Sequence, residues 1–435
     1  MRDVVLIIFL VTVIPLIFYR PIIGLSLWSW SALFIPTYYV YGVASLVPYG
    51  KLFAGLTVIS WVFSKKSKIN IDASRLTIVF ILLLWITLTS ILSINQVIDP
   101  WIQYDRVVKV FIAMLFVGLL VRTKEEIHLL LFFLVAALAF HGVVEGLKYI
   151  ASGGGHRITG PVKSIIWDNN QFALAMCTIA PFFYYYWGNK NSTAVKLIIL
   201  GVAGLILISV IGTHSRGGFV GLLFMGGWLF IKSKRKILAS VAILIVALGF
   251  SFLVTENWSS RMETLNTVEE DSSFMGRVVA WKQSVLIAMD RPVVGGGFYS
   301  VQDYQVWLKY AENFDKLSMI ETPEPNPYRA HAAHSIYFQV LGDHGFVGFI
   351  LFAIFFIVVI VDAYKTAKYS KRYKELDWLF RLSSMMIFSF LIFFTVGAGL
   401  SMAYFELMYI LAAIVFSMRK FIQTHKAEQE KIQET

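Results

Sequence analysis

Long apolar runs recur along the whole of this 435-residue sequence, and they constrain its fold more than any other feature. Each run has roughly 16 to 22 residues, enough for a helix to cross a hydrocarbon core of about 30 Å. Hydrophobic residues make up 57% of the chain and charged residues 15%. This composition excludes a soluble globular domain. We therefore predict an all-α polytopic membrane protein.

The apolar runs predict about twelve transmembrane helices. They lie at residues 4–19, 50–64, 76–94, 107–121, 127–150, 169–187, 197–213, 217–231, 238–255, 336–361, 379–396 and 400–418. The region 21–49 is also apolar, but Pro21, Pro36 and Pro48 interrupt it, and Trp and Tyr are frequent. Proline breaks helices and these aromatic residues favour the membrane interface, so a re-entrant segment is expected there.

Lys and Arg concentrate in alternate short connections between the runs, which predicts the cytoplasmic side of the membrane. By parity both termini are cytoplasmic, with residues 1–255 carrying nine helices, 334–418 carrying three and 419–435 forming a tail. No small-residue cleavage site follows the first run, which is expected to remain as an anchor. The net charge of +11 is explained by this topology and by anionic membrane lipids, and nucleic acid is not expected as a partner.

The largest polar interval, residues 256–333, is predicted to be a partly helical loop on the side opposite the cytoplasm. Basic residues on this side oppose the usual charge bias, and they include Arg157, Arg216, Arg261, Arg277 and Arg291. Arg216 opens a helix after a break and is followed by Gly217 and Gly218, which allow close approach to the backbone. Guanidinium groups bind phosphate oxygens in pairs, so a diphosphate site is expected. Pairing with the eleven carboxylates of the loop is the alternative for Arg277 and Arg291.

His331 and His334 precede the next apolar run and would share one side of a helix. A metal site would need a third ligand at suitable spacing, and none is found nearby in the sequence, so no metal is predicted. His334 could instead accept a proton from an attacking hydroxyl group, because neighbouring arginines would keep the pKa of its imidazole low. A purely structural histidine is the alternative. His141, Glu145 and Lys148 are expected to pair with one another on one helix face.

Several short motifs carry a family resemblance. Ten residues separate His334 from Gly345, three separate Arg261 from Leu265, Arg216 lies in Ser-Arg-Gly, and Asp168 and Asn170 open an apolar run after Arg157. This arrangement resembles the O-antigen ligase and polymerase superfamily of bacterial inner membranes. The stretch from Arg277 to Gly348 is also similar to exosortase-associated O-glycosylation ligases.

The resemblance implies a GT-C-like glycosyltransferase without a cofactor. It would transfer a glycan from undecaprenyl diphosphate to the lipid A core oligosaccharide on the periplasmic face, with inversion at the anomeric carbon. The loop at residues 256–333 would be a periplasmic lid. His334 would be the base. Arg216, Arg261, Arg157 and Arg277 would bind the diphosphate, with support from His331, Asp168, Asn170 and Arg291.

Metal-dependent enzymes of this kind use carboxylates in the first outer loop, whereas residues 20–49 contain no Asp or Glu. A metal-independent reaction is therefore expected. A polymerase, a protein O-glycosylation ligase, a transporter or flippase, and a non-catalytic scaffold remain as alternatives.

Overall fold

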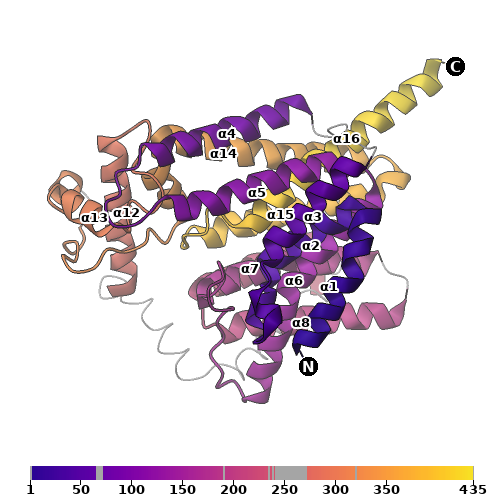
Figure 1. Ribbon diagram of the computed structural model, residues 1–435, viewed down its shortest axis with the longest axis horizontal. Coiled ribbons are helices and arrows are strands. Elements are labelled where there is room, and N and C mark those ends of the chain that lie inside the picture. Colours follow the sequence, from indigo (N-terminus) through magenta and orange to yellow (C-terminus); the bar gives the residue numbers. More distant parts are fainter. Residues whose placement is uncertain are drawn as a thin grey trace.

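Every secondary-structure element that the structure describes is helical, in agreement with the predicted all-α class (Figure 1). The computed structural model describes residues 2–64, 72–189, 192–233, 236–237, 240, 272–318 and 321–434. The predicted span 238–255 lies almost entirely outside the described residues, as do Arg261 and Leu265.

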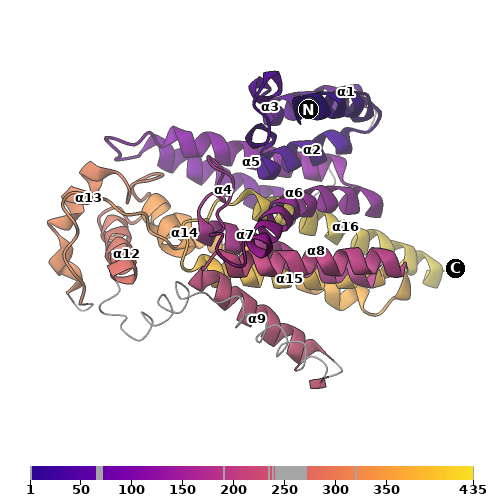
Figure 2. The ribbon, with the colours of Figure 1, turned by 90° about the horizontal axis from the view of Figure 1, so that it is seen from below.

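The bundle is built from α1 (Arg2–Tyr19), α2 (Pro21–Phe34), α3 (Tyr49–Phe63), α4 (Ala73–Ile91), α5 (Trp101–Leu120), α6 (Lys124–Ala151), α7 (Asn169–Gly188), α8 (Thr193–Gly212), α9 (Arg216–Lys232), α14 (Ile336–Ser370), α15 (Asp377–Gly397) and α16 (Glu406–Glu434). In the predicted loop lie α12 (Ser272–Asp290), α13 (Tyr304–Ala311) and the short turn η3 (Phe314–Leu317). The part of the loop that is described is therefore partly helical, as predicted. Both α12 and α13 lie at one end of the bundle (Figure 1 and Figure 2).

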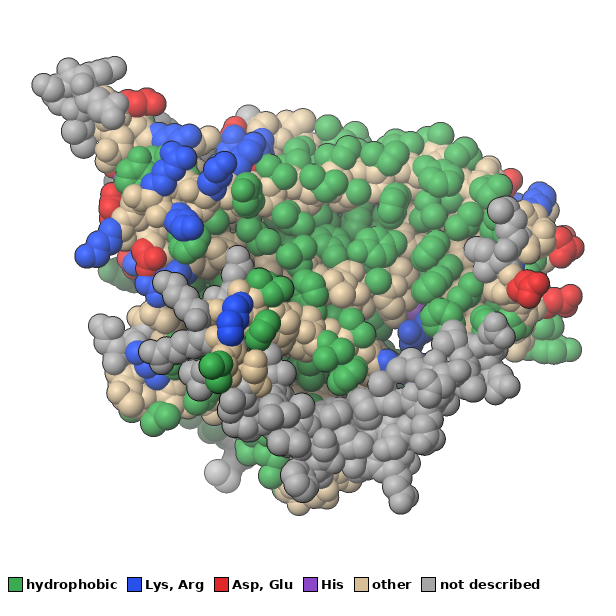
Figure 3. Space-filling view, turned by 180° about the vertical axis from the view of Figure 1, so that it is seen from behind, with side chains coloured by type: hydrophobic (Ala, Val, Ile, Leu, Met, Phe, Trp, Pro, Cys, Tyr) green, Lys and Arg blue, Asp and Glu red, His purple; other side chains and the backbone are tan. Residues whose placement is uncertain are grey.

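The described helices have the lengths and composition of membrane spans. Seven of them are long and apolar enough to cross a membrane, namely α1, α4, α6, α8, α14, α15 and α16, and α2, α3 and α9 are shorter apolar helices. Hydrophobic side chains form a broad band on the surface, beside an end where Lys and Arg gather (Figure 3). This distribution matches a multi-pass membrane protein.

Two predicted boundaries near the C-terminus are wrong. The last helix begins at Glu406, after a loop at residues 398–405, although the sequence predicted a span from residue 400. The same helix continues to Glu434, so the described part of the predicted tail, residues 419–434, extends α16. Small residues such as Gly399 and Ser401 end α15, and a hydropathy window averages over a loop of this length.

Residues 21–49 do not form the predicted re-entrant segment, because α2 runs along α6 as a separate helix. Arg20, at the end of α1, lies 3.6 Å from the carboxylate of Glu126 in the first turn of α6. From there α2 runs along α6, so that the carbonyl of Leu33 reaches His141 Nε2 at 3.2 Å. Asp3 lies against Gly42, beyond the far end of α2. Arg20, at the end of α1, pairs with Glu126, so the start of α1 lies at the end of the bundle opposite the start of α6. The sequence analysis had placed both starts on the same side of the membrane.

A kink in α14 holds the Gly295-Gly296-Gly297 turn of the long loop. Gly345 has φ 67° and ψ −172°, which breaks the helical backbone. The amide of Gly296 donates to the carbonyl of Gly342 at 2.9 Å, and the amide of Gly297 donates to that of Asp343 at 2.8 Å. Carbonyls released by the kink thus regain partners inside an apolar region, where an unsatisfied group is costly. The turn fixes the loop to the helix that follows His334.

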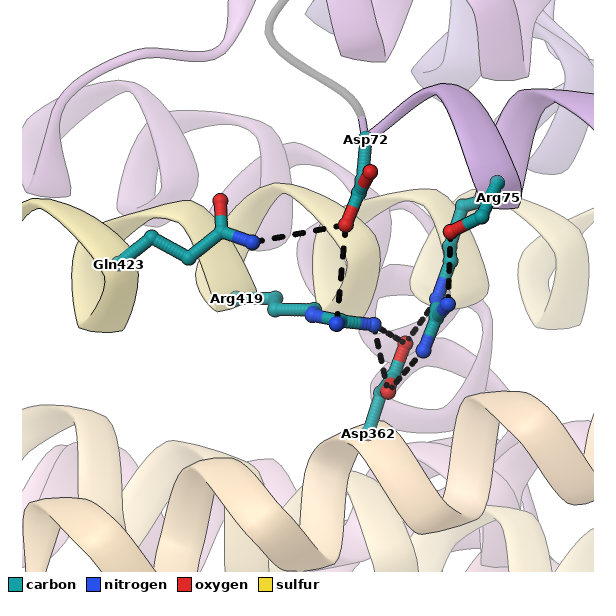
Figure 4. A network of polar contacts seen from close by, with 6 residues as sticks. Asp72, Arg75, Asp362, Arg419 and Gln423 are labelled. Atoms are coloured by element: carbon teal, nitrogen blue, oxygen red, sulfur yellow. Dashed lines mark hydrogen bonds and ion pairs between the residues drawn. The ribbon is translucent and has the colours of Figure 1, made fainter.

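The opposite end of the bundle is held by a network of charged side chains (Figure 4). Asp362 of α14 is 1% exposed and accepts two hydrogen bonds of 2.7 Å from Arg75 of α4. Arg419 of α16 approaches the same carboxylate at 3.3 Å and lies 3.6 Å from Asp72. The network joins three helices that are far apart in sequence.

Candidate active site

His334 is held by backbone contacts in the segment that leads into α14. Its amide donates to Ser401 Oγ at 2.8 Å, and the neighbouring Ala333 carbonyl accepts from Trp281 Nε1 at 2.6 Å. The backbone of His334 is left-handed, with φ 44°. The prediction that His331 and His334 share a helix face is wrong, because Ser335 is the N-cap and α14 begins at Ile336.

The surroundings of His334 favour its neutral form. Burial lowers the pKa of the imidazole below its ordinary value, and the charges of Arg277 and, to a smaller extent, His331 lower it further, whereas Asp168 raises it. The predicted direction of the shift is confirmed, although burial contributes more than the arginine. These effects place the predicted residues Arg277, Asp168 and His331 within electrostatic reach of His334. A neutral imidazole near pH 7 can accept a proton.

Arg277 extends from α12 toward the loop between α15 and α16. A Cβ atom placed on Gly399 would lie 3.6 Å from Arg277 Nη1, so the guanidinium group lies against the backbone of this loop. Ser401, from the same loop, accepts the His334 amide. The sequence analysis missed both residues because it shortened this loop to residues 397–399 and assigned Ser401 to a span. The Gly397-Ala398-Gly399 sequence is the signal that could have located the turn.

The N-termini of α7 and α9 meet beside each other. Asp168 caps α7 by accepting from the Asn170 amide at 2.9 Å, and Ser215 caps α9 by accepting from the Gly218 amide at 3.1 Å. Ser215 Oγ donates to Asn170 Oδ1 at 2.7 Å, which links the two caps. Arg216 is the first residue of α9. Through its neighbour Ser215, Arg216 is thus linked to Asp168, the carboxylate that raises the pKa of His334. Free amides at helix N-termini favour anions.

The glycines after Arg216 allow close packing of helices. A Cβ atom on Gly218 would lie 2.9 Å from Ala173 Cβ of α7, and one on Gly221 would lie 2.9 Å from Cys177 Sγ. Gly218 thus admits α7 to the backbone of α9. The glycine motif was interpreted as room for a bound group, and in the structure a neighbouring helix occupies that space.

The other predicted site residues lie in different surroundings. Arg291 donates to the carbonyl of Leu92 at 2.8 Å, at the C-terminal end of α4. Arg157 is exposed, and the next residue, Ile158, donates to the carbonyl of Gly212 at the end of α8. The ring centroid of His331 is 5.7 Å from that of Trp307. Arg261 lies outside the described residues.

The predicted group of charged residues on α6 forms only in part. Lys148 Nζ lies 2.6 Å from Glu145 Oε1, as predicted. The second carboxylate oxygen of Glu145 contacts His156 Nε2 at 2.8 Å, which ties the 151–168 loop to the helix. His141 does not join this group, because its Nδ1 is 2.6 Å from the hydroxyl oxygen of Tyr39.

Comparison with known proteins assigns families to two parts of the chain. Residues 1–193 match a family of unknown function (DUF5935). Residues 201–353 match the family described as O-antigen ligase, and this segment contains Arg216, Arg277 and His334. An O-antigen ligase of Salmonella typhimurium is 22% identical over 227 residues, which cover 49% of this chain and 53% of the relative. The chain thus matches about half the length of that relative. Both comparisons thus relate this chain to O-antigen ligases, and the family match lies at residues 201–353.

Proposed function

We propose that the protein transfers a glycan from undecaprenyl diphosphate to the lipid A core oligosaccharide at the periplasmic face of a bacterial inner membrane. The observation that carries the proposal is His334, which lies inside the O-antigen ligase domain and is kept neutral by burial and by Arg277. A neutral imidazole next to a cationic group suits a reaction that removes a proton from a hydroxyl group while an anionic group leaves.

In the proposed reaction, His334 accepts the proton of the acceptor hydroxyl as its oxygen attacks the anomeric carbon of the donor sugar. The bond between this carbon and the diphosphate oxygen breaks, and undecaprenyl diphosphate leaves with the electron pair. Attack from the side opposite the leaving group inverts the anomeric centre. The left-handed backbone of His334, fixed by Ser401, would orient the imidazole toward the acceptor.

Arg216 and Arg277 are the proposed diphosphate ligands among the described residues, with Arg157 and Arg261 as further candidates. Arg216 stands at the N-terminus of α9, where backbone amides add to the positive potential. Charge-assisted hydrogen bonds from guanidinium groups stabilise the negative charge that develops on the leaving group. No step of this reaction calls for a metal ion. Asp168 and Asn170 would position the N-termini of α7 and α9 through Ser215.

The test is glycan transfer by purified protein supplied with a lipid-diphosphate glycan and lipid A core acceptor in the presence of EDTA. The parent should form product, and His334→Ala should lose about 10²-fold or more of the rate, as expected for loss of a general base. Arg216→Ala should also abolish transfer. His425→Ala is the matched control, because this histidine contacts Glu375 and Tyr369 at the other end of the bundle.

Each variant should melt at the parental temperature, so that loss of folding is separated from loss of chemistry. Transfer at the parental rate in His334→Ala would refute the base, and unchanged transfer in Arg216→Ala would remove this residue from the site. Chain extension on the lipid carrier without lipid A acceptor would identify a polymerase. Glycan movement across a vesicle membrane without a new glycosidic bond would identify a transporter.

A further inference from the structure

A cavity lies between α2, α3, α5 and the start of α16, and His334 is not among the residues that line it. Its volume is about 370 Å³, within the range of ligand pockets. Most of its lining residues, among them Trp28, Lys51 and Arg106, come from the segment that matches a family of unknown function. Three others, including Glu406, come from α16.

The wall of this cavity is mostly apolar, with cations at its edge. Lys51 and Arg106 line it and are exposed, and no carboxylate among the described residues lies within ion-pair distance of either. Lys109, a third lining cation, pairs with Asp105. A cavity with apolar walls and two cations that form no ion pair with the described residues suits the junction between an acyl chain and an anionic head group.

Glu406 indicates that the ligand of this cavity also carries a hydrogen-bond donor. Its Oε2 atom is buried and has no hydrogen-bond partner among the described residues. The charge of Arg106 acts on this carboxyl group, so the two side chains belong to one electrostatic environment. A buried acceptor without a partner is costly, and a ligand hydroxyl would satisfy it.

The turn beside the cavity is built to lie at a membrane interface. Tyr41, Val43 and Leu46 are 84%, 72% and 80% exposed, although they are apolar or aromatic. The turn is nevertheless anchored, because the Tyr39 hydroxyl contacts His141 Nδ1 and the Leu33 carbonyl contacts His141 Nε2. Exposed apolar side chains on a fixed turn favour insertion among lipids.

We propose that this cavity binds the head group of a phosphorylated lipid that also carries a hydroxyl group, at a site separate from His334. Lys51 and Arg106 bind the phosphate, Glu406 accepts a hydrogen bond from the hydroxyl, and the apolar wall covers the first part of the lipid chain. The site needs no glycan transfer, so it stands apart from the proposed reaction. Phosphatidylglycerol and lipid A share this chemistry, because each carries both phosphate and hydroxyl groups.

The test measures lipid affinity by native mass spectrometry of the full chain in detergent. Phosphatidylglycerol has an anionic phosphate and a head-group hydroxyl. Phosphatidylmethanol lacks the hydroxyl, and phosphatidylcholine lacks the net negative charge. Affinity should decrease in that order. The double variant Lys51→Gln with Arg106→Gln should weaken phosphatidylglycerol binding by about tenfold or more, because charge-assisted contacts are the strong ones. Lys309→Gln, an exposed lysine outside the cavity, should leave the affinity unchanged.

Glu406→Ala should remove the preference for phosphatidylglycerol over phosphatidylmethanol. If that preference persists, Glu406 does not bind the hydroxyl. Equal binding of phosphatidylglycerol and phosphatidylcholine, or parental affinity in the double variant, would overturn the site. The single variants replace the double one if it fails to fold, since both cations are exposed. Competition by lipid A against phosphatidylglycerol then shows which of the two lipids binds more tightly.

Discussion

Replacement of Gly345 by alanine tests why the family motif places a glycine after His334. At φ 67° and ψ −172° an L-residue is strained by about 1–3 kcal/mol. The added Cβ atom would also lie 2.8 Å from the Gly295 nitrogen and 2.8 Å from the Pro292 oxygen. Both neighbours are backbone atoms, so a side-chain rotation cannot relieve the contacts. The turn at residues 292–297 must move out of the kink.

Movement of the turn breaks three backbone hydrogen bonds. They join Gly296 to Gly342 at 2.9 Å, Gly297 to Asp343 at 2.8 Å and Phe346 to Pro292 at 2.9 Å. At about 0.5–1.5 kcal/mol each, their loss with the backbone strain destabilises the folded state by about 2.5–7.5 kcal/mol. A typical domain is stable by only about 5–15 kcal/mol. The substitution should therefore lower the melting temperature strongly.

The assay combines thermal melting in detergent with hydrogen exchange at the amides of Gly296 and Gly297. Gly345→Ala should lower the melting temperature and expose both amides to exchange. Gly276→Ala in α12 is the matched control, because no described atom lies within 4 Å of the added Cβ. The control should be neutral or stabilising by up to about 1 kcal/mol. A Gly345→Ala variant with parental melting and protected amides would refute the account of the kink.

The remaining predictions concern charge. The pKa of His334 is lowered in the folded protein, so the acid limb of the transfer rate should lie at a lower pH than an unperturbed histidine would give. Arg277→Gln should raise this pKa and move the acid limb of the transfer rate to higher pH, and Asp168→Asn should move it to lower pH; identical pH profiles would contradict the electrostatics. Asp362→Ala should destabilise the fold by about 3–5 kcal/mol, since it leaves two guanidinium groups without their buried partner. Arg419→Gln, at a side chain 32% exposed, should cost about 0–1 kcal/mol, and melting temperatures should rank the two variants in that order.

Helices were predictable from the sequence where long apolar runs end at charged or capping residues. The predicted span 379–396 corresponds to α15, Asp377–Gly397, and 169–187 corresponds to α7, Asn169–Gly188. The prediction failed at residues 398–405, because a short loop between two apolar helices barely changes a hydropathy average. It also failed for α1, since the direction of a span depends on which partners its ends meet, such as Arg20 and Glu126.

Part of the candidate site was predictable from residue chemistry. Basic residues on the side opposite the other basic loops, and a histidine before an apolar run, indicated Arg216, Arg277 and His334. Ser401 gave no such signal, because its role is to accept the backbone amide of a residue 67 positions away. Arg291 had the same chemistry as the other arginines, yet it contacts the Leu92 carbonyl.

The sequence by itself determined that the chain is an all-α membrane protein and which residues are able to bind an anion or accept a proton. Hydropathy and ionisation are properties of each residue and its near neighbours, so they can be read without a fold. Only the tertiary structure decided which of these residues meet. It brought Arg277 and Asp168 within electrostatic reach of His334, and it filled the space at Gly218 with Ala173. These contacts depend on how segments that are far apart in the sequence pack against one another. The position of one helix along its neighbour is not determined by either sequence segment alone.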